Sequence, residues 1–157
     1  MQKIHPCLWF DGRAEEAMNL YMAIFANAKM TDVMRYGDGG PGPKGSVLTC
    51  GFELDGQQFT ALNGGPMYQF TPAISLVVMC ETQAEVDRYW NALLDGGRPQ
   101  QCGWLTDKFG VTWQIVPTVL GQLLKDKDAA KASRVMQAMM KMVKLDIAGL
   151  QRAAESN

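Results

Sequence analysis

The 157-residue chain contains one histidine, His5, and four cysteines, none of which stands in a CxxC pair. A single imidazole excludes sites built on two or more histidines. Widely separated cysteines lack the paired spacing typical of structural zinc sites, although four thiolates remain a formal alternative. We therefore expect the cysteines to be reduced, buried thiols; they are Cys7, Cys50, Cys80 and Cys102.

Long apolar runs and an excess of one charge are also missing. No apolar stretch reaches the roughly 18 residues that a membrane-spanning helix needs, and residues 1–6 lack the apolar block of a signal peptide. The 15 Lys and Arg residues nearly balance the 16 Asp and Glu residues, and no run of five like charges occurs. We expect a cytoplasmic protein with neither a nucleic-acid nor a membrane partner.

What the chain does have is enough apolar sequence for one core. Hydrophobic residues make up 47% of it, which excludes disorder, and its length fits one domain or two small halves.

The first half predicts the element order strand, helix, strand, strand, strand. Apolar residues at helical spacing, such as Ala17, Tyr21 and Ile24, give the helix one buried face, and Asp11 is a candidate cap for it. Asp55-Gly56 predicts a hairpin turn. The elements are expected at 4–10, 14–25, 30–36, 47–54 and 58–62, with a glycine- and proline-rich mobile loop at 37–45.

The same order restarts near residue 73, so we predict an internal repeat. A strand at 73–79, a helix at 83–94, and strands at 101–105 and 111–116 are expected. Beyond Pro117 the chain turns helical, with a short helix at 119–124, a helix from the Asp128 cap to about 143, and a helix at 147–154 capped by Asp146. The methionines near residue 140 predict a flexible apolar stripe.

Several segments resemble the PhnB-like family, whose members are often labelled 3-demethylubiquinone-9 3-methyltransferase. They are LWFDGRAEEA at 8–17, ALNGGP at 61–66, WLTDKFGVTWQI at 104–115 and the tail at 131–142. The family belongs to the glyoxalase/bleomycin-resistance (vicinal oxygen chelate) superfamily. The resemblance implies an α+β fold with two βαβββ modules, at about 3–66 and 72–117, that form a curled, partly open mixed sheet around a cavity. A helical tail at 118–157 would complete this single domain, and a homodimer is expected.

The resemblance also implies where a site would lie. In metal-dependent members of the superfamily, four ligands come from the first and last strands of each module. Those positions fall here on His5, Thr60, Ser75 and Gln114. This set has one imidazole and no carboxylate, which is a poor donor set for a divalent cation, so we expect neither a metal nor another cofactor.

The residues favour a binding site for a small molecule. Strand parity places Cys7 and Trp9 on the same face as His5, and Trp104 is a further candidate for the cavity wall. We therefore expect a metal-free cavity that holds a small apolar or aromatic molecule.

Two alternatives stay open, and with them the question of whether the protein is an enzyme. In the first, His5 acts with Gln114 in acid–base catalysis on a small substrate. In the second, the protein transfers a methyl group as the family label says. The sequence lacks the glycine-rich strand-to-helix loop typical of S-adenosylmethionine enzymes, since the loop at 37–45 precedes a strand.

Overall fold

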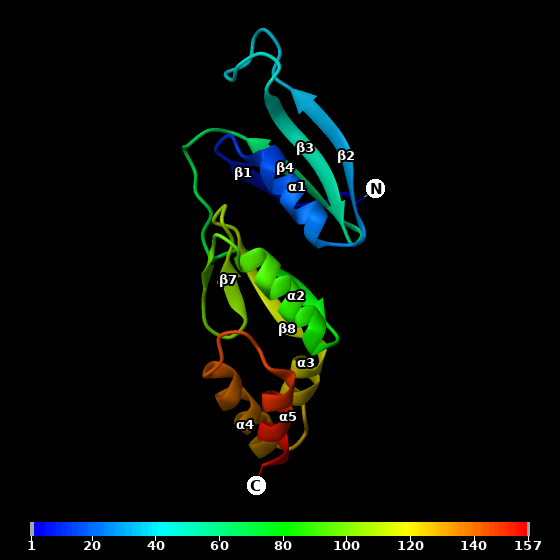
Figure 1. Cartoon of the computed structure of the whole chain (residues 1–157), viewed down its shortest axis with the longest axis vertical. Helices are drawn as coiled ribbons and strands as arrows, with labels where there is room; N and C mark the ends of the chain where they lie inside the picture. The colour runs from blue at the N-terminus through cyan, green and yellow to red at the C-terminus, as the bar shows by residue number, and fades with distance from the viewer. Residues whose placement is uncertain (1, 157) are drawn as a thin grey trace. The chain divides into compact units, whose positions relative to one another are not determined.

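The computed structural model describes residues 2–156 and divides the chain into two compact units, with the division after Phe70. Each unit contains one helix packed on a four-stranded mixed sheet, and the second unit also carries the C-terminal helices (Figure 1). The two sheets have the same strand order, which confirms the predicted α+β fold of two βαβββ modules.

Unit 1 consists of residues up to Phe70. Its strands are β1 (Cys7–Phe10), β2 (Ala28–Arg35), β3 (Val47–Leu54) and β4 (Gln57–Asn63), and its helix is α1 (Ala14–Ile24). The sheet order is β1-β4-β3-β2, in which β1 runs parallel to β4 and the other neighbours are antiparallel. The predicted hairpin is present between β3 and β4, where Asp55 and Gly56 take positive φ angles of 48° and 85°.

The core of unit 1 lies between α1 and one face of this sheet. The buried strand residues alternate with exposed or half-buried ones, as Leu8 and Phe10 do on β1, so that one face packs on the helix. Tyr21 of α1 lies 6.3 Å from Phe52 of β3, measured between ring centroids. Ala14 and Ala17 let the helix approach the sheet closely, because both are fully buried and small.

Two expectations for this unit are wrong in detail. Strand β1 begins at Cys7 and not at residue 4; Pro6 has no N–H to donate, and only its carbonyl joins the ladder, accepting the Thr60 N–H at 3.0 Å. Asp11 does not cap α1. The side-chain oxygen of Asn63 instead accepts the Ala14 N–H at 2.9 Å, so the cap comes from the end of β4, 49 residues away in sequence.

Unit 2 repeats this plan with β5 (Ser75–Cys80), α2 (Gln83–Leu94), β6 (Arg98–Pro99), β7 (Trp104–Thr106) and β8 (Thr112–Pro117). The sheet order is β5-β8-β7-β6, and β5 runs parallel to β8. The helix α2 has the predicted bounds, and the Thr82 side chain caps it by accepting the Glu85 N–H. Its residues Val86, Trp90 and Leu93 are buried against the sheet.

The strand expected at 101–105 is only partly present. Cys102 and Gly103 form a turn with positive φ angles of 62° and 83°, and β7 begins after them. Their N–H groups do not pair with a strand but donate to the carbonyls of Met142 and Val143. The two-residue strand β6 was not predicted.

The C-terminal part of unit 2 contains α3 (Thr118–Leu124), α4 (Ala129–Met140) and α5 (Ile147–Glu155). Its core consists of Leu120, Val135, Leu145, Leu150 and Ala154. Asp128 caps α4 as predicted, although the helix ends at Met140 and not near 143. Asp146 makes no side-chain cap to α5; the Ile147 N–H donates to the Gln83 side chain of α2 at 2.8 Å.

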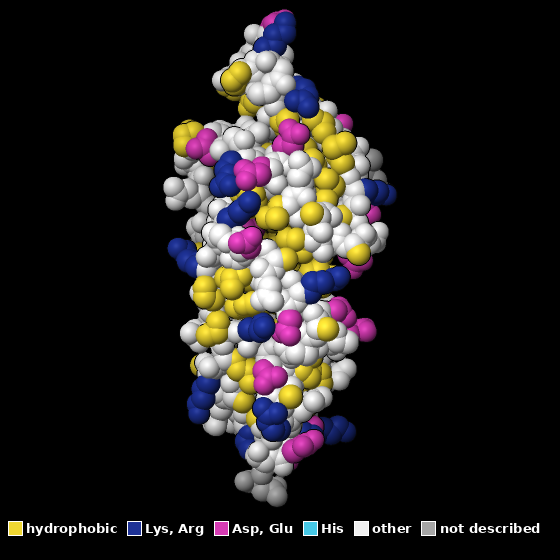
Figure 2. Space-filling view, in the orientation of Figure 1, with side chains coloured by type: hydrophobic (Ala, Val, Ile, Leu, Met, Phe, Trp, Pro, Cys, Tyr) yellow, Lys and Arg dark blue, Asp and Glu magenta, His cyan; other side chains and the backbone are white. Residues whose placement is uncertain are grey.

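The surface mixes charges of both signs. On the face shown in Figure 2, Lys and Arg side chains are interspersed with Asp and Glu side chains. Among the residues that the structure describes, no helix has the length and apolar composition needed to cross a bilayer.

Candidate functional site

Each sheet has one face packed on its helix and a second face that points away from that helix. We call this second face the helix-free face. Strand register defines it: Cys7 lies opposite Thr60 and Trp9 opposite Leu62 in unit 1, and Val77 lies opposite Gln114 in unit 2. The predicted site residues on the strands all belong to these faces.

In unit 1, His5 and Thr60 form a hydrogen-bonded pair. His5 lies two residues before β1 and is exposed, and its Nε2 lies 3.0 Å from the hydroxyl oxygen of Thr60 on β4. Which group donates depends on the ring tautomer. The imidazole is thus oriented by a hydroxyl, and not by a carboxylate.

In unit 2, Gln114 and Ser75 form the matching pair. The amide Nε2 of Gln114 on β8 donates to the Ser75 hydroxyl on β5 at 2.9 Å. Trp104 on β7 lies directly opposite Gln114 in the antiparallel register, so the indole and the amide share the helix-free face.

The four positions that the resemblance implied therefore form two pairs, one in each unit. Both pairs join the first strand segment of a module to the parallel last strand. Their donor atoms are one imidazole nitrogen, two hydroxyls and one amide, which do not fit a divalent cation that needs charge neutralisation. Across residues 2–156, no group of three or more His, Cys, Asp or Glu side chains could hold a metal ion.

Trp9 is held from several sides. Its indole N–H donates to the Gly65 carbonyl at 2.8 Å, and the Tyr68 ring meets it edge-on at 4.9 Å between centroids. A Cβ added at Gly64 would overlap the indole, so only glycine fits there. The segment after β4 thus fixes the Trp9 ring, which stays half-buried on the helix-free face.

The cysteines divide into two kinds. Cys50 and Cys80 are fully buried, and burial raises the pKa of each thiol from 9.0 to about 11, with a smaller contribution from the nearby Glu15 and Glu85 carboxylates respectively. Cys7 and Cys102 contradict the expectation of burial, because Cys7 is exposed and Cys102 is only half-buried. Partial desolvation nevertheless raises the pKa of Cys7, so Cys7 is not an activated nucleophile.

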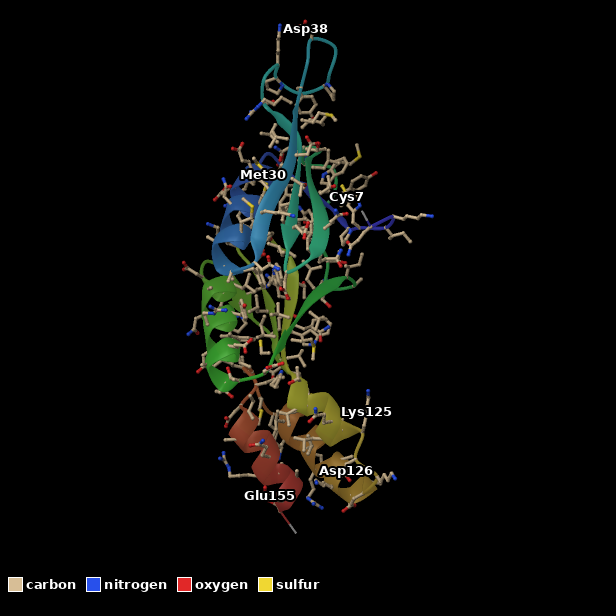
Figure 3. All side chains as sticks on the ribbon, turned by 90° about the vertical axis from the view of Figure 1, so that its right-hand side faces the viewer. Cys7, Met30, Asp38, Lys125, Asp126 and Glu155 are labelled. Atoms are coloured by element: carbon tan, nitrogen blue, oxygen red, sulfur yellow. The ribbon has the colours of Figure 1, made fainter. Side chains whose placement is uncertain are left out.

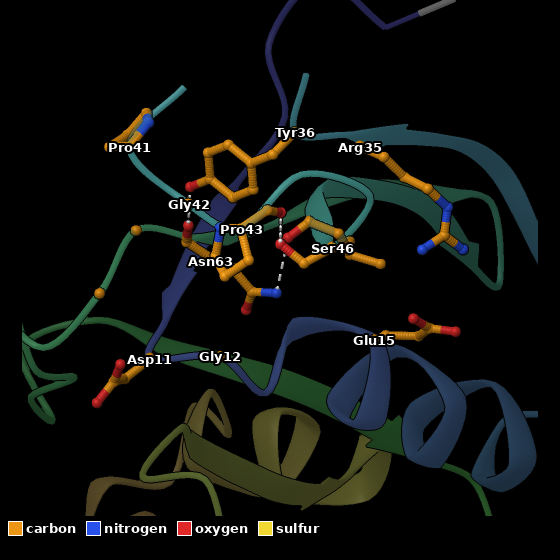
Figure 4. Close-up of a pocket in the computed structure, with 13 residues that line it drawn as sticks. Asp11, Gly12, Glu15, Arg35, Tyr36, Pro41, Gly42, Pro43, Ser46 and Asn63 are labelled. Carbon is orange, nitrogen blue, oxygen red and sulfur yellow. Dashed lines mark hydrogen bonds between the residues drawn. The ribbon is translucent and has the colours of Figure 1, made fainter. Parts of the chain in front are cut away.

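A pocket in unit 1 was not predicted. It has a volume of about 580 Å³ and lies between the start of α1, the loop from β2 to β3, and the turn after β4 (Figure 4). Its charged lining residues are Asp11, Glu15 and Arg35, and glycines and prolines supply much of the rest. The sequence offered one signal, the glycine- and proline-rich loop, whose tip carries Asp38 (Figure 3).

The Asn63 side chain and the Tyr36 hydroxyl hold this pocket together. The Asn63 amide donates to the Val47 carbonyl at 3.0 Å while its oxygen caps α1, so it ties β3 to the helix. The Tyr36 hydroxyl donates to the Asn63 carbonyl at 2.8 Å. Cβ atoms added at Gly40 and Gly42 would overlap the Tyr36 ring, which shows how closely the loop wraps that side chain.

Comparison with known proteins identifies relatives for most of the chain. The family model described as 3-demethylubiquinone-9 3-methyltransferase matches residues 2–116, which include every residue of the two predicted pairs and of the pocket. The C-terminal helices lie outside this match, so their resemblance to the family's ending stays a prediction. None of the curated proteins matches the chain.

Solved structures give the same result. A PhnB protein from Bacillus cereus, described as a 3-demethylubiquinone-9 3-methyltransferase, is 38% identical, with a TM-score of 0.69, over 74% of this chain and 100% of that one. Protein PA1353 from Pseudomonas aeruginosa is 23% identical over 74% and 98% of the two chains, with a TM-score of 0.62. The fosfomycin resistance protein FosX from Listeria monocytogenes, solved with Mn(II) and sulfate, is 14% identical over 78% and 97%, with a TM-score of 0.51, and shares the fold alone.

Proposed function

The chain belongs to the 3-demethylubiquinone-9 3-methyltransferase family, and on that premise we propose that it binds a small apolar or aromatic molecule on the helix-free face of a sheet. The main support for this proposal is the two hydrogen-bonded pairs. His5 pairs with Thr60 and Gln114 pairs with Ser75, at equivalent places in the two modules.

Polar groups of this kind suit the recognition of a neutral ligand. Hydroxyl, imidazole and amide groups donate or accept hydrogen bonds without demanding a charged partner. Apolar neighbours supply contact area, with Trp9 and Cys7 in unit 1 and Trp104 in unit 2. A few convergent polar groups among apolar ones is the usual composition of a small-molecule site.

Metal-dependent chemistry is not part of the proposal, because the donor set does not fit it. A divalent ion bound by one imidazole, two hydroxyls and an amide would keep its full charge. The carboxylate of Glu53 on β3 does not supply the missing negative charge, because it pairs with the Lys29 ammonium at 3.6 Å.

Acid–base catalysis by His5 with Gln114 is a weaker candidate. The only hydrogen bond to the imidazole within the described chain comes from the neutral Thr60 hydroxyl. A hydroxyl neither fixes one tautomer nor stabilises the imidazolium as a carboxylate does. The ring is better suited to binding than to proton transfer.

Methyl transfer is the second candidate, and the family description favours it. S-adenosylmethionine carries a positively charged sulfonium and would supply the methyl group. The glycine-rich loop of this chain leads into β3 and so presents no helix N-terminus to a ligand. Titration calorimetry with S-adenosylmethionine decides the matter, and saturable binding would favour methyl transfer over the proposal.

The binding proposal is tested by a thermal-shift screen of aromatic and apolar small molecules, including a water-soluble quinone because the family description names ubiquinone. We expect at least one compound to raise the melting temperature of the wild-type protein in a dose-dependent way. A screen in which no compound does so would contradict the proposal.

The residues are then tested with the compound that binds. Gln114→Ala or His5→Ala, whichever lies in the unit that binds the compound, is expected to weaken its binding about tenfold or more, since it removes a polar contact. Gln151→Ala, an exposed substitution on α5, is the control and should leave the dissociation constant unchanged. Equal affinity in all four proteins would place the ligand elsewhere.

A further inference from the structure

We propose that the pocket in unit 1 is a second ligand site, separate from the helix-free faces, and that it takes a small amino acid carrying a second amine. The site is built by side chains from the start of α1 and the end of β2, beneath the loop that joins β2 to β3 (Figure 4).

The charges of the pocket are available to a ligand. Within residues 2–156, neither Asp11 nor Glu15 forms a hydrogen bond or ion pair through its carboxylate. Arg35 makes one bond, from Nη1 to the Gly45 carbonyl at 3.1 Å, which leaves its other donors free. Opposite charges that line one pocket without pairing leave room for a molecule that bridges them.

The arrangement of these charges specifies the ligand. In Figure 4, Arg35 and Glu15 lie toward one end of the pocket, and Asp11 lies toward the other. A guanidinium and a carboxylate that line one pocket match the α-carboxylate and α-ammonium of an amino acid. The second carboxylate, Asp11, then matches a side-chain ammonium. The net charge of the three groups is −1, which complements a ligand of net charge +1.

The pocket is a partly open hollow with one fixed wall. Asn63 and Tyr36 tie its back wall to α1 and β3, as described above, and Pro41 and Pro43 stiffen the loop over it. Its volume of about 580 Å³ is ample for an amino acid of lysine size. Gly12 and Gly65 line it, and no heavy atom lies within 4 Å of the place of a Cβ at either glycine.

The probe is free L-lysine, titrated into the full-length protein and followed by amide NMR shifts. L-Norleucine, which lacks the side-chain ammonium, and cadaverine, which lacks the carboxylate, are the comparison ligands. We expect L-lysine to bind saturably and at least about tenfold more tightly than either, because only lysine satisfies all three charges. Added salt should weaken its binding.

Substitutions in the pocket assign the contacts. Asp11→Asn should weaken lysine about tenfold and leave norleucine unchanged, whereas Glu15→Gln should weaken both. Glu81→Gln, an exposed acidic position in unit 2, is the control. The melting temperature of each variant shows that it is folded. Absence of saturable lysine binding, or binding that survives both pocket substitutions, overturns the proposal.

The loop provides a second, independent pair of variants. Gly42→Ala places a methyl group against the Tyr36 ring and should displace the loop and weaken lysine binding. Gly39→Ala in the same loop meets no atom within 4 Å and should bind as the wild type does. Equal binding by both variants would show that the loop takes no part in the site.

Discussion

At the scale of single residues, Asp107 has the most demanding environment described in the chain. Its side chain is buried, with 3% exposed, and one carboxylate oxygen accepts the Phe109 and Val111 N–H groups while the other accepts the Trp113 indole N–H at 2.9 Å. Asp107 thereby closes the turn between β7 and β8 and fixes Trp113 in the core. Asp107, Phe109, Val111 and Trp113 lie in the segment 104–115, which is one of the segments that resemble the family.

Asp107→Asn should destabilise the protein by about 1–3 kcal/mol. The substituted amide keeps the shape but brings an NH₂ group against at least one N–H donor, so buried donors lose their acceptor. Urea unfolding measures the change. Asp95→Asn, at the exposed end of α2, serves as the control and should shift the free energy of unfolding by no more than about 0.5 kcal/mol. A neutral Asp107→Asn substitution would contradict the structural role.

The buried thiols predict how stability depends on alkaline pH. The pKa of Cys50 and Cys80 is about 11 in the folded protein and 9.0 in an ordinary thiol. As the pH rises above 9, the unfolded chain loses these protons while the folded protein keeps them, so stability falls between pH 9 and 11. Replacing both residues by alanine should flatten this part of the pH–stability curve. The same slope in the double variant would refute the assignment.

At the scale of elements, Gln83 joins α2 to the C-terminal helices. Its amide nitrogen donates to the Leu145 carbonyl at 3.1 Å, and its oxygen accepts the Ile147 N–H at 2.8 Å. Nearby, the Lys144 ammonium lies 2.9 Å from the Asp87 carboxylate. One side chain thus satisfies two backbone groups at the start of α5 that no residue of that helix satisfies.

Gln83→Ala should loosen α5 while leaving the sheet of unit 2 intact. The two backbone groups lose their partners, which costs about 1–3 kcal/mol. Hydrogen–deuterium exchange should show faster exchange over residues 145–155 and unchanged exchange over β5 and β8. Gln137→Ala, exposed on α4, is the matched control. If residues 145–155 exchange at the wild-type rate in both variants, Gln83 does not anchor the helix.

Elements with a strong local signal could be predicted from the sequence. The helix α2 has a Thr82 cap and a clear apolar face, and the β3–β4 hairpin has an Asp-Gly turn. The failures have nonlocal causes. The cap of α1 comes from Asn63, and the turn at Cys102 is stabilised by carbonyls of residues 142 and 143, which no local pattern reveals.

At the scale of the whole molecule, part of the candidate site could be predicted from the sequence and part could not. The positions His5, Thr60, Ser75 and Gln114 followed from the resemblance, and the structure pairs them within each unit. The pocket of unit 1 could not be predicted, because Asp11 and Glu15 near the start of α1 come to line one pocket with Arg35 at the end of β2 only through the fold of the sheet.

The whole chain is also predicted to form a homodimer. Val77 and Met79 on the helix-free face of β5 are 52% and 54% exposed, and apolar residues grouped on one sheet face favour association. Light scattering should give about twice the chain mass of 17.3 kDa. Val77→Lys combined with Met79→Lys should lower that mass, whereas Met140→Lys, at an equally exposed position on α4, should not. A wild-type mass of one chain would refute the dimer, and an unaffected double variant would place its interface elsewhere.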